Sequence, residues 1–117
     1  MASHVFAGIR VGSFDAARPW YERLLGEPSF FPHATEAVWT LADGGSVYVV
    51  EDATASGHAV LTVFVDDLAA ALAEIAARGL EPAEQETYGS GARKAIFRDA
   101  DGNEVGFAGQ DVAPSQA

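Results

Sequence analysis

The sequence predicts an α+β domain made of two similar halves, each of which runs strand, helix, strand and hairpin strand. The order of β-rich runs, helical runs and turns in residues 4–51 is repeated in residues 58–109. In each half a histidine, at position 4 or 58, precedes the valine that closes the first strand by the same seven residues. An Asp-Gly pair then stands between two β-rich runs in each half, which is a strong hairpin signal. This internal repeat of about fifty residues indicates two copies of one structural module.

The first half is expected to begin with a strand over residues 4–11, followed by a helix from Asp15 to Leu25 that stops at Gly26. Pro19 cannot donate a backbone hydrogen bond, so the regular helix starts close before it or bends there. An apolar face continues beyond the proline, formed by Trp20, Tyr21, Leu24 and Leu25. A strand over 37–41, the turn 43–45, a strand over 46–51 and a linker over 52–57 complete this half.

The second half repeats this order, with a strand over 58–65 and a helix from Leu68 to Arg78. Asp66 or Asp67 is expected to cap the first amides of this helix, and Gly79 is expected to end it in the left-handed conformation. Its apolar stripe, at positions i, i+3, i+4 and i+7, is formed by Leu68, Ala71, Leu72 and Ile75. Strands over 94–98 and 103–107 flank the turn at 101–102, and residues 110–117 are expected to form a loose tail.

Composition limits the class of protein. The chain has 117 residues, of which 49 % are hydrophobic, so one packed domain over residues 1–117 is expected. It has no cysteine, which removes disulfides, thiolate metal ligands and cysteine nucleophiles together. No apolar run approaches the roughly 18 residues of a membrane span, and the N-terminus lacks a basic segment followed by an apolar stretch. A cytoplasmic location, away from membranes, is the default expectation.

The chain is strongly acidic, with 17 acidic and 7 basic residues and a formal charge of −10. Such a surface repels phosphate backbones, so nucleic acid is not expected to be a partner. The same field would attract a cationic ligand if the acidic residues gather at a pocket mouth. The alternative is that the charge serves only to keep the protein in solution.

Two sets of motifs resemble the vicinal oxygen chelate superfamily of glyoxalases, bleomycin-resistance proteins and extradiol dioxygenases. The first set is Val11-Gly12-Ser13-Phe14, followed by Trp20-Tyr21 and Leu24-Leu25-Gly26. The second set is Val65-Asp66-Asp67-Leu68 with Arg78-Gly79, followed by Phe97-Arg98-Asp99-Ala100-Asp101-Gly102-Asn103. The resemblance implies two βαβββ modules, about 4–51 and 58–109, whose mixed sheets curl around a central pocket. It also implies a homodimer, in which some members exchange modules between chains.

Metal-dependent members of this superfamily hold a divalent ion with four side chains, usually His, Glu or Gln, from the first and last strand of each module. The resemblance places these four positions at Phe6, Val49, Val60 and Gly106. None of the four offers an imidazole nitrogen or a carboxylate oxygen, so the usual metal site is absent and no cofactor is expected.

A displaced metal site is the alternative. His4, His58 and Glu104 each lie two residues before an expected ligand, and a shift of two keeps a side chain on the same face of a strand, about 6–7 Å away. Val47, at the matching fourth position, offers no ligand. The other interpretation is that both histidines begin their strands and point to solvent.

The residues expected to face the central pocket are mostly apolar, as in most small-molecule sites. Phe6, Val60 and Phe64 supply the apolar wall, and Gly8 and Gly106 either leave room for a ligand or mark a close strand approach. Arg10 and Thr62 share this face.

Three further residues are candidates for ligand contact. Trp39 would stack on a planar ligand, although an aromatic residue on a strand is more often part of the core. Tyr88 and Arg93 enclose the Gly-rich loop 88–93, where Arg93 would anchor an anion or lie on the surface.

These features leave three functional classes open. The first is a metal-free binding protein that sequesters an aromatic or cationic compound, as the antibiotic-binding members of the superfamily do. The second is a lyase, isomerase or dioxygenase that uses the displaced metal site. The third is a metal-free enzyme in which His4, His58 or Glu104 acts as a general base.

Overall fold

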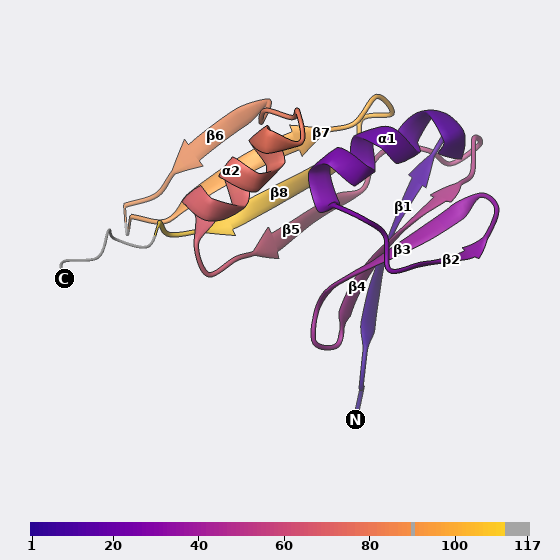
Figure 1. The fold of residues 1–117 in the computed structure, drawn as a ribbon, viewed down its shortest axis with the longest axis horizontal. Coiled ribbons are helices and arrows are strands. Elements are labelled where there is room, and N and C mark those ends of the chain that lie inside the picture. The colour runs from indigo at the N-terminus through magenta and orange to yellow at the C-terminus, as the bar shows by residue number, and fades with distance from the viewer. Residues whose placement is uncertain (90, 112–117) are drawn as a thin grey trace. The chain divides into compact units, whose positions relative to one another are not determined.

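The computed structural model describes residues 1–89 and 91–111, which form the two helices and eight strands of Figure 1. In chain order they are β1 (Val5–Val11), α1 (Phe14–Leu25), β2 (Phe30–His33), β3 (Glu36–Ala42), β4 (Gly45–Glu51), β5 (Val60–Phe64), α2 (Leu68–Ala77), β6 (Glu84–Thr87), β7 (Arg93–Arg98) and β8 (Glu104–Gly109). Each half therefore reads βαβββ, as the resemblance predicted. Over the described ranges, neither helix is long and apolar enough to cross a membrane.

Each module contains one four-stranded mixed sheet. The strand orders are β1-β4-β3-β2 and β5-β8-β7-β6. In both sheets the first and last strands of the module pair in parallel, and the other pairs are antiparallel. This confirms the predicted α+β fold with two βαβββ modules, whereas the curl of the sheets around a central pocket stays a prediction.

The chain divides into two compact units whose limits differ slightly from the sequence repeat. The first unit contains residues 1–59 and the turn 99–103, and the second contains residues 60–98 and the chain from 104 onward. The turn connects β7 to β8 along the chain, yet its contacts place it in the first unit. That both units belong to one domain stays a prediction.

Both helices begin at a side-chain cap. Ser13 Oγ accepts a hydrogen bond from the Ala16 amide at 3.2 Å, and α1 starts at Phe14 with Pro19 inside it. Asp67 caps α2 by accepting from the Ala70 amide at 3.2 Å, as predicted. A capping side chain satisfies one of the amides that the first helical turn leaves free.

The strands alternate between two faces. In β1, Ile9 and Val11 are fully buried on the face that packs against α1, while Phe6 and Arg10 point to the opposite face. In the second unit α2 packs against β8, and its buried side chains include Leu68 and Ile75 of the predicted stripe. We call the face of each sheet that points away from its own helix the distal face.

Two details differ from the sequence-based expectation. Strands β2 and β6 were not among the predicted segments. Strand β5 begins at Val60, two residues later than expected, because His58 adopts a left-handed backbone with φ of 70° that interrupts an extended strand. Ser90 of the Gly-rich loop and residues 112–117 of the expected tail lie outside the described residues.

The turn 99–103 is held by a buried polar network. Tyr21 Oη donates to Asp99 Oδ2 at 2.7 Å, and Asn103 Nδ2 donates to the same carboxylate oxygen and to the Arg10 carbonyl at 2.9 Å. The Ala59 amide donates to Asn103 Oδ1 at 3.0 Å. Burial first, and then the bond to Asp99, raise the pKa of the Tyr21 hydroxyl well above its usual value. Within the first unit, the network joins α1, β1 and Ala59 to one short turn.

Candidate functional site

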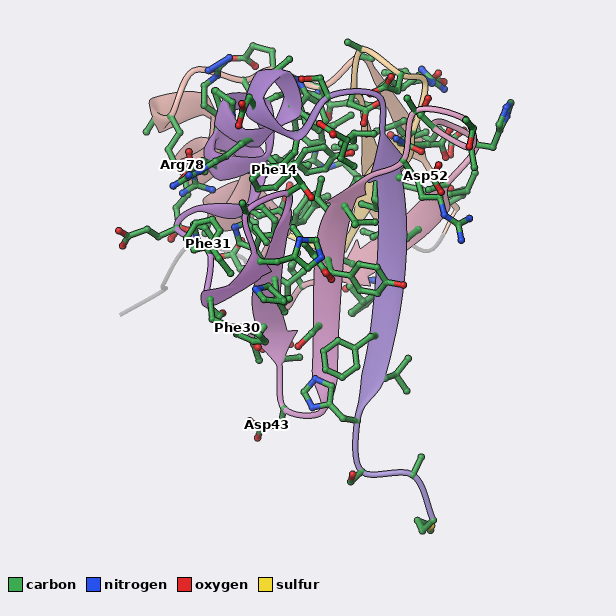
Figure 2. All side chains as sticks on the ribbon, turned by 90° about the vertical axis from the view of Figure 1, so that its right-hand side faces the viewer. Phe14, Phe30, Phe31, Asp43, Asp52 and Arg78 are labelled. Atoms are coloured by element: carbon green, nitrogen blue, oxygen red, sulfur yellow. The ribbon has the colours of Figure 1, made fainter. Side chains whose placement is uncertain are left out.

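The distal face of the first sheet is rich in aromatic side chains. Phe6 on β1 is 54 % exposed, and His4 lies against it with a ring-centroid distance of 4.6 Å. Phe30 on β2 pairs with Val38 and is half exposed, whereas its neighbour Phe31 lies under the Arg18 guanidinium of α1. Figure 2 labels both phenylalanines. A hollow of about 400 Å³ adjoins this face, lined by Gly8, Arg10, Ala55, Gly57, His58 and Ala59.

The space above Gly8 is filled by a neighbouring side chain. A Cβ on Gly8 would lie 2.5 Å from both Cζ and Oη of Tyr48, which is opposite Gly8 in the parallel pairing of β1 and β4. The absence of a side chain at Gly8 therefore leaves room for the Tyr48 ring of the same sheet. The sequence-based alternatives were room for a ligand or a close approach of strands, and neither included this tyrosine.

The strand register also corrects the assignment of the fourth metal-ligand position. Val47 and Val49 pair with Ala7 and Ile9, so both point to the helix side, and Val49 is fully buried there. The choice of Val49 was wrong, because Tyr48 occupies in the first sheet the place that Gly106 occupies in the second. Among Phe6, Tyr48, Val60 and Gly106, the Tyr48 phenol oxygen is the one side-chain oxygen or nitrogen atom, and such a set does not fit a divalent metal ion.

Each residue of the displaced metal set has its own local surroundings. His4 Nε2 lies 2.8 Å from Ser46 Oγ, His58 lies in the turn before β5, and Glu104 accepts a hydrogen bond from Arg98. Over residues 1–89 and 91–111 there is no group of three His, Cys, Asp or Glu side chains that could hold a metal ion. The absence of a bound metal nevertheless stays a prediction, as does the general-base alternative.

The distal face of the second sheet exposes a larger apolar surface. Val60 and Phe64 on β5 are 70 % and 75 % exposed, and Thr62 lies between them on the same face. Ala108 on β8 lies on the same face and is partly exposed, whereas Ile96 on β7 lies on this face but is buried. Exposed aromatic and branched side chains of this size commonly mark a surface that binds a ligand or another protein.

A lysine crosses the centre of this second distal face. A Cβ on Gly106 would lie 2.5 Å from Cε and 3.5 Å from Nζ of Lys94, and 3.5 Å from the Thr62 hydroxyl oxygen. The Lys94 side chain thus lies over Gly106 and beside Thr62. The sequence reasoning missed this residue.

Charged side chains lie around the lysine on the same sheet. Arg98 forms ion pairs with Glu84 and Glu104, and the hydrogen bond that Arg98 donates to Glu84 is the main cause that raises the pKa of Arg98. Glu86, opposite Lys94 in the pairing of β6 and β7, accepts a 2.8 Å hydrogen bond from the Tyr88 hydroxyl.

The other predicted contact residues have different surroundings. Trp39 is 1 % exposed and its indole N–H donates to the Gly26 carbonyl at 2.8 Å, so a core role accounts for its environment. The Arg93 guanidinium donates to Gln85 and Asp111, and Tyr88 is exposed beside Glu86. Ligand contact by Trp39, Tyr88 and Arg93 stays a prediction.

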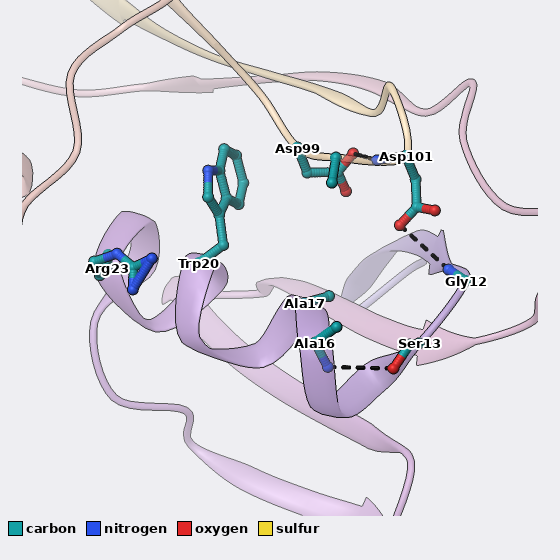
Figure 3. A pocket seen from close by; sticks show the side chains of 9 residues that line it. Gly12, Ser13, Ala16, Ala17, Trp20, Arg23, Asp99 and Asp101 are labelled. Atoms are coloured by element: carbon teal, nitrogen blue, oxygen red, sulfur yellow. Dashed lines mark hydrogen bonds between the residues drawn. The ribbon is translucent and has the colours of Figure 1, made fainter.

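A separate pocket of about 470 Å³ lies in the first unit beside α1 (Figure 3). Trp20, Ala16 and Ala17 form one side of it and the turn residues Asp99 and Asp101 the other. Its carboxylates are already engaged: Asp101 accepts from the Gly12 amide at 3.2 Å, and the Asp99 carboxylate accepts from Tyr21 and from the turn itself. The pocket is large enough for a small molecule, but the carboxylates of Asp99 and Asp101 already accept hydrogen bonds that hold the turn.

Comparison with known proteins agrees with this architecture. The family model described as Glyoxalase/Bleomycin resistance protein/Dioxygenase superfamily matches residues 2–107. A glyoxalase/bleomycin resistance protein from Catenulispora acidiphila is 49 % identical with a TM-score of 0.87, and the match covers 94 % of this chain and 98 % of that one. No curated protein matches the sequence.

Two more distant structures share the fold. A bleomycin-binding protein in complex with bleomycin has a TM-score of 0.70 at 18 % identity, with 93 % of this chain and 98 % of that chain covered. Lactoylglutathione lyase from Agrobacterium tumefaciens has a TM-score of 0.69 at 16 % identity, with 92 % and 93 % covered. Two βαβββ modules in one chain define the vicinal oxygen chelate class of fold. The chain belongs to the glyoxalase/bleomycin resistance protein/dioxygenase superfamily.

Proposed function

We propose that this protein binds a small aromatic compound without a metal ion, using the distal faces of its two sheets. The observation that carries the proposal is the exposed apolar surface of Val60 and Phe64 on the second sheet, with Phe6 and Phe30 on the first. Exposing so much apolar surface is unfavourable in water, and a bound ligand or partner would remove the cost.

The metal-free part of the proposal rests on the chemistry of the side chains. The positions that hold the metal in metal-dependent relatives are Phe6, Tyr48, Val60 and Gly106 in this chain. These residues suit contact with an apolar ring far better than coordination of a hard cation. The bleomycin complex of the distant relative supports sequestration as the use of such a protein.

A homodimer is part of the proposal. The distal faces present large apolar side chains that a second copy of the chain would cover, and a ligand held between two copies would be shielded from water on both sides. The strands β2 and β6 also leave sheet edges open for pairing.

A neutral reporter dye tests ligand binding. N-phenyl-1-naphthylamine is expected to bind saturably, with a rise in its fluorescence. Phe64→Ser is expected to weaken this binding about tenfold or more, because burial of one aromatic side chain contributes about 1.5–3 kcal/mol.

Phe31→Ser is the matched control, since Phe31 is an exposed phenylalanine that lies under Arg18 on the helix side. It is expected to leave dye binding unchanged, as is Trp20→Phe in the pocket beside α1. Absence of saturable binding, or equal losses with Phe64→Ser and Phe31→Ser, would contradict the proposal.

A further inference from the structure

Lys94 is the only lysine among the 117 residues, and its place on the second distal face is specific. It stands on β7, diagonally across from Gly106 on β8, and its side chain passes over that glycine. Any side chain at position 106 would occupy the same space, since a Cβ there would approach Lys94 Cε to 2.5 Å. The pair Lys94 and Gly106 therefore brings an ammonium group to the part of this face that lies beside Thr62, between the exposed side chains of Val60 and Phe64.

The charge of Lys94 has no ion-pair partner among the described residues. This is unexpected in a chain with 17 acidic residues. The carboxylates on the neighbouring strands have other partners: Glu84 and Glu104 pair with Arg98, and Glu86 accepts from Tyr88. Lys94 is half-buried, and no carboxylate of the described residues lies within ion-pair distance of it, although Glu86 is opposite it in the strand pairing. Its ammonium can therefore donate to an anionic group.

We propose that Lys94 binds the anionic group of an aromatic carboxylate, with the Thr62 hydroxyl as a second donor beside it. This inference rests on the proposed function, and it names the ligand class of the same site. The ring of such a ligand would lie against Val60 and Phe64, which flank Thr62 on β5. The Lys94 ammonium would thus favour an anion at this point of the face, whereas Glu84, Glu86 and Glu104 on the same face, like the net charge of the protein, would favour a cation.

A series of three ligands with the same ring system and different charge tests the proposal. The ligands are 2-naphthoate, neutral 2-naphthamide and the cationic 2-naphthylmethylammonium, and each displaces N-phenyl-1-naphthylamine from the protein. Salt at about 0.15 M limits the influence of distant charges, because the Debye length is then about 8 Å. Naphthoate is expected to bind about tenfold more tightly than naphthamide, as for a charge-assisted hydrogen bond, and the ammonium compound is expected to bind least tightly.

Variants at the lysine separate this proposal from general apolar binding. Lys94→Met is expected to abolish the preference for naphthoate while dye binding remains, and Lys94→Arg is expected to keep the preference. Gly106→Ala retains the lysine but displaces its side chain, so it is expected to reduce the preference as well, with far-ultraviolet circular dichroism checking the fold. If dye binds but wild-type protein binds naphthamide or the ammonium compound as tightly as naphthoate, the proposal fails and the proposed function stands.

Chemical labelling gives a second readout. Acetylation by an N-hydroxysuccinimide ester, followed by mass spectrometry of the peptide that contains Lys94, is expected to slow about tenfold in saturating naphthoate. The α-amino group of the chain is the internal control and should react at an unchanged rate. Equal labelling of Lys94 with and without naphthoate would overturn the proposal. If wild-type protein does not bind the dye at all, the proposed function is contradicted, and this inference is contradicted with it.

Discussion

The Tyr21 hydroxyl donates a 2.7 Å hydrogen bond to the Asp99 carboxylate, and both side chains are buried. The bond joins α1 to a turn that lies 78 residues further along the chain. Asp99 also accepts from the backbone amides of Asp101 and Asn103, so its carboxylate organises the turn as well as the helix. A buried carboxylate of this kind is costly unless each of its partners is present.

Tyr21→Phe is expected to lower the free energy of unfolding by about 1–3 kcal/mol, because it leaves a buried carboxylate one donor short. Urea denaturation followed by circular dichroism measures the change. Tyr88→Phe is the control: it removes an exposed hydroxyl bonded to Glu86, and about 0.5 kcal/mol or less should be lost. Equal losses in the two variants would contradict the role given to the buried bond.

The raised pKa of Tyr21 predicts a loss of stability in alkali. Folding keeps this hydroxyl protonated, so its contribution is complete below the unfolded pKa of about 10 and is lost progressively as pH rises above it. One proton released on unfolding corresponds to about 1.4 kcal/mol per pH unit. Unfolding free energies between about pH 9 and 11 should therefore fall more steeply for the wild type than for Tyr21→Phe, and parallel curves would contradict the assignment.

Gly57→Ala is expected to destabilise the protein by at least about 2 kcal/mol. Gly57 has a φ of 87°, and a Cβ at this position would lie 2.6 Å from the Asp101 carbonyl oxygen. Gly89→Ala is the control variant, since a Cβ at position 89 meets nothing within 4 Å, and it is expected to cost little stability. Thermal unfolding of both variants gives the result: a near-wild-type Gly57→Ala would show that the backbone relaxes at little cost.

The proposed dimer predicts a sedimenting mass of about twice the 12.2 kDa of one chain at micromolar concentration. Val60→Asp places a charge among the apolar side chains of the second distal face, and it is expected to shift the equilibrium toward the monomer. A wild-type protein that sediments as a single chain would argue against this part of the proposal.

The side chains at the ligand positions predict that purified protein carries no stoichiometric divalent ion. Elemental analysis of protein prepared without chelator is the measurement. About one zinc, iron, nickel or manganese ion per chain, lost on His4→Ala or His58→Ala, would favour the enzyme alternative with a displaced site.

The regular elements with strong periodicity could be predicted from the sequence. The stripe that contains Leu68 and Ile75, the cap at Asp67 and the alternation along β1 follow from local rules and are present in the structure. Strands β2 and β6 could not be predicted in this way. The first is a four-residue edge strand that contains Pro32, and the second reads Glu-Gln-Glu-Thr without an apolar alternation.

Which side chains share a distal face depends on the pairing register of the strands, and this register could not be derived from the sequence. Tyr48 rather than Val49 faces away from the helix because β4 pairs with β1 in the register that places Tyr48 opposite Gly8 and Val49 opposite Ile9. Likewise, the approach of Lys94 to Gly106 is a diagonal contact between two strands. Its only trace in the sequence is a glycine among larger residues of a strand.

The turn 99–103 belongs to the first unit, although the second half of the sequence contains it. This limits where a chain with such an internal repeat could be cut into two separate proteins. A fragment ending at residue 59 would keep β1 to β4 and α1, but it would lack five residues that complete its hydrogen bonds. The Tyr21 hydroxyl would lose its acceptor, and the Ala59 amide and Arg10 carbonyl would lose Asn103. The first unit therefore depends on a turn that the second half of the sequence supplies, and a stable N-terminal fragment would have to carry a copy of this turn.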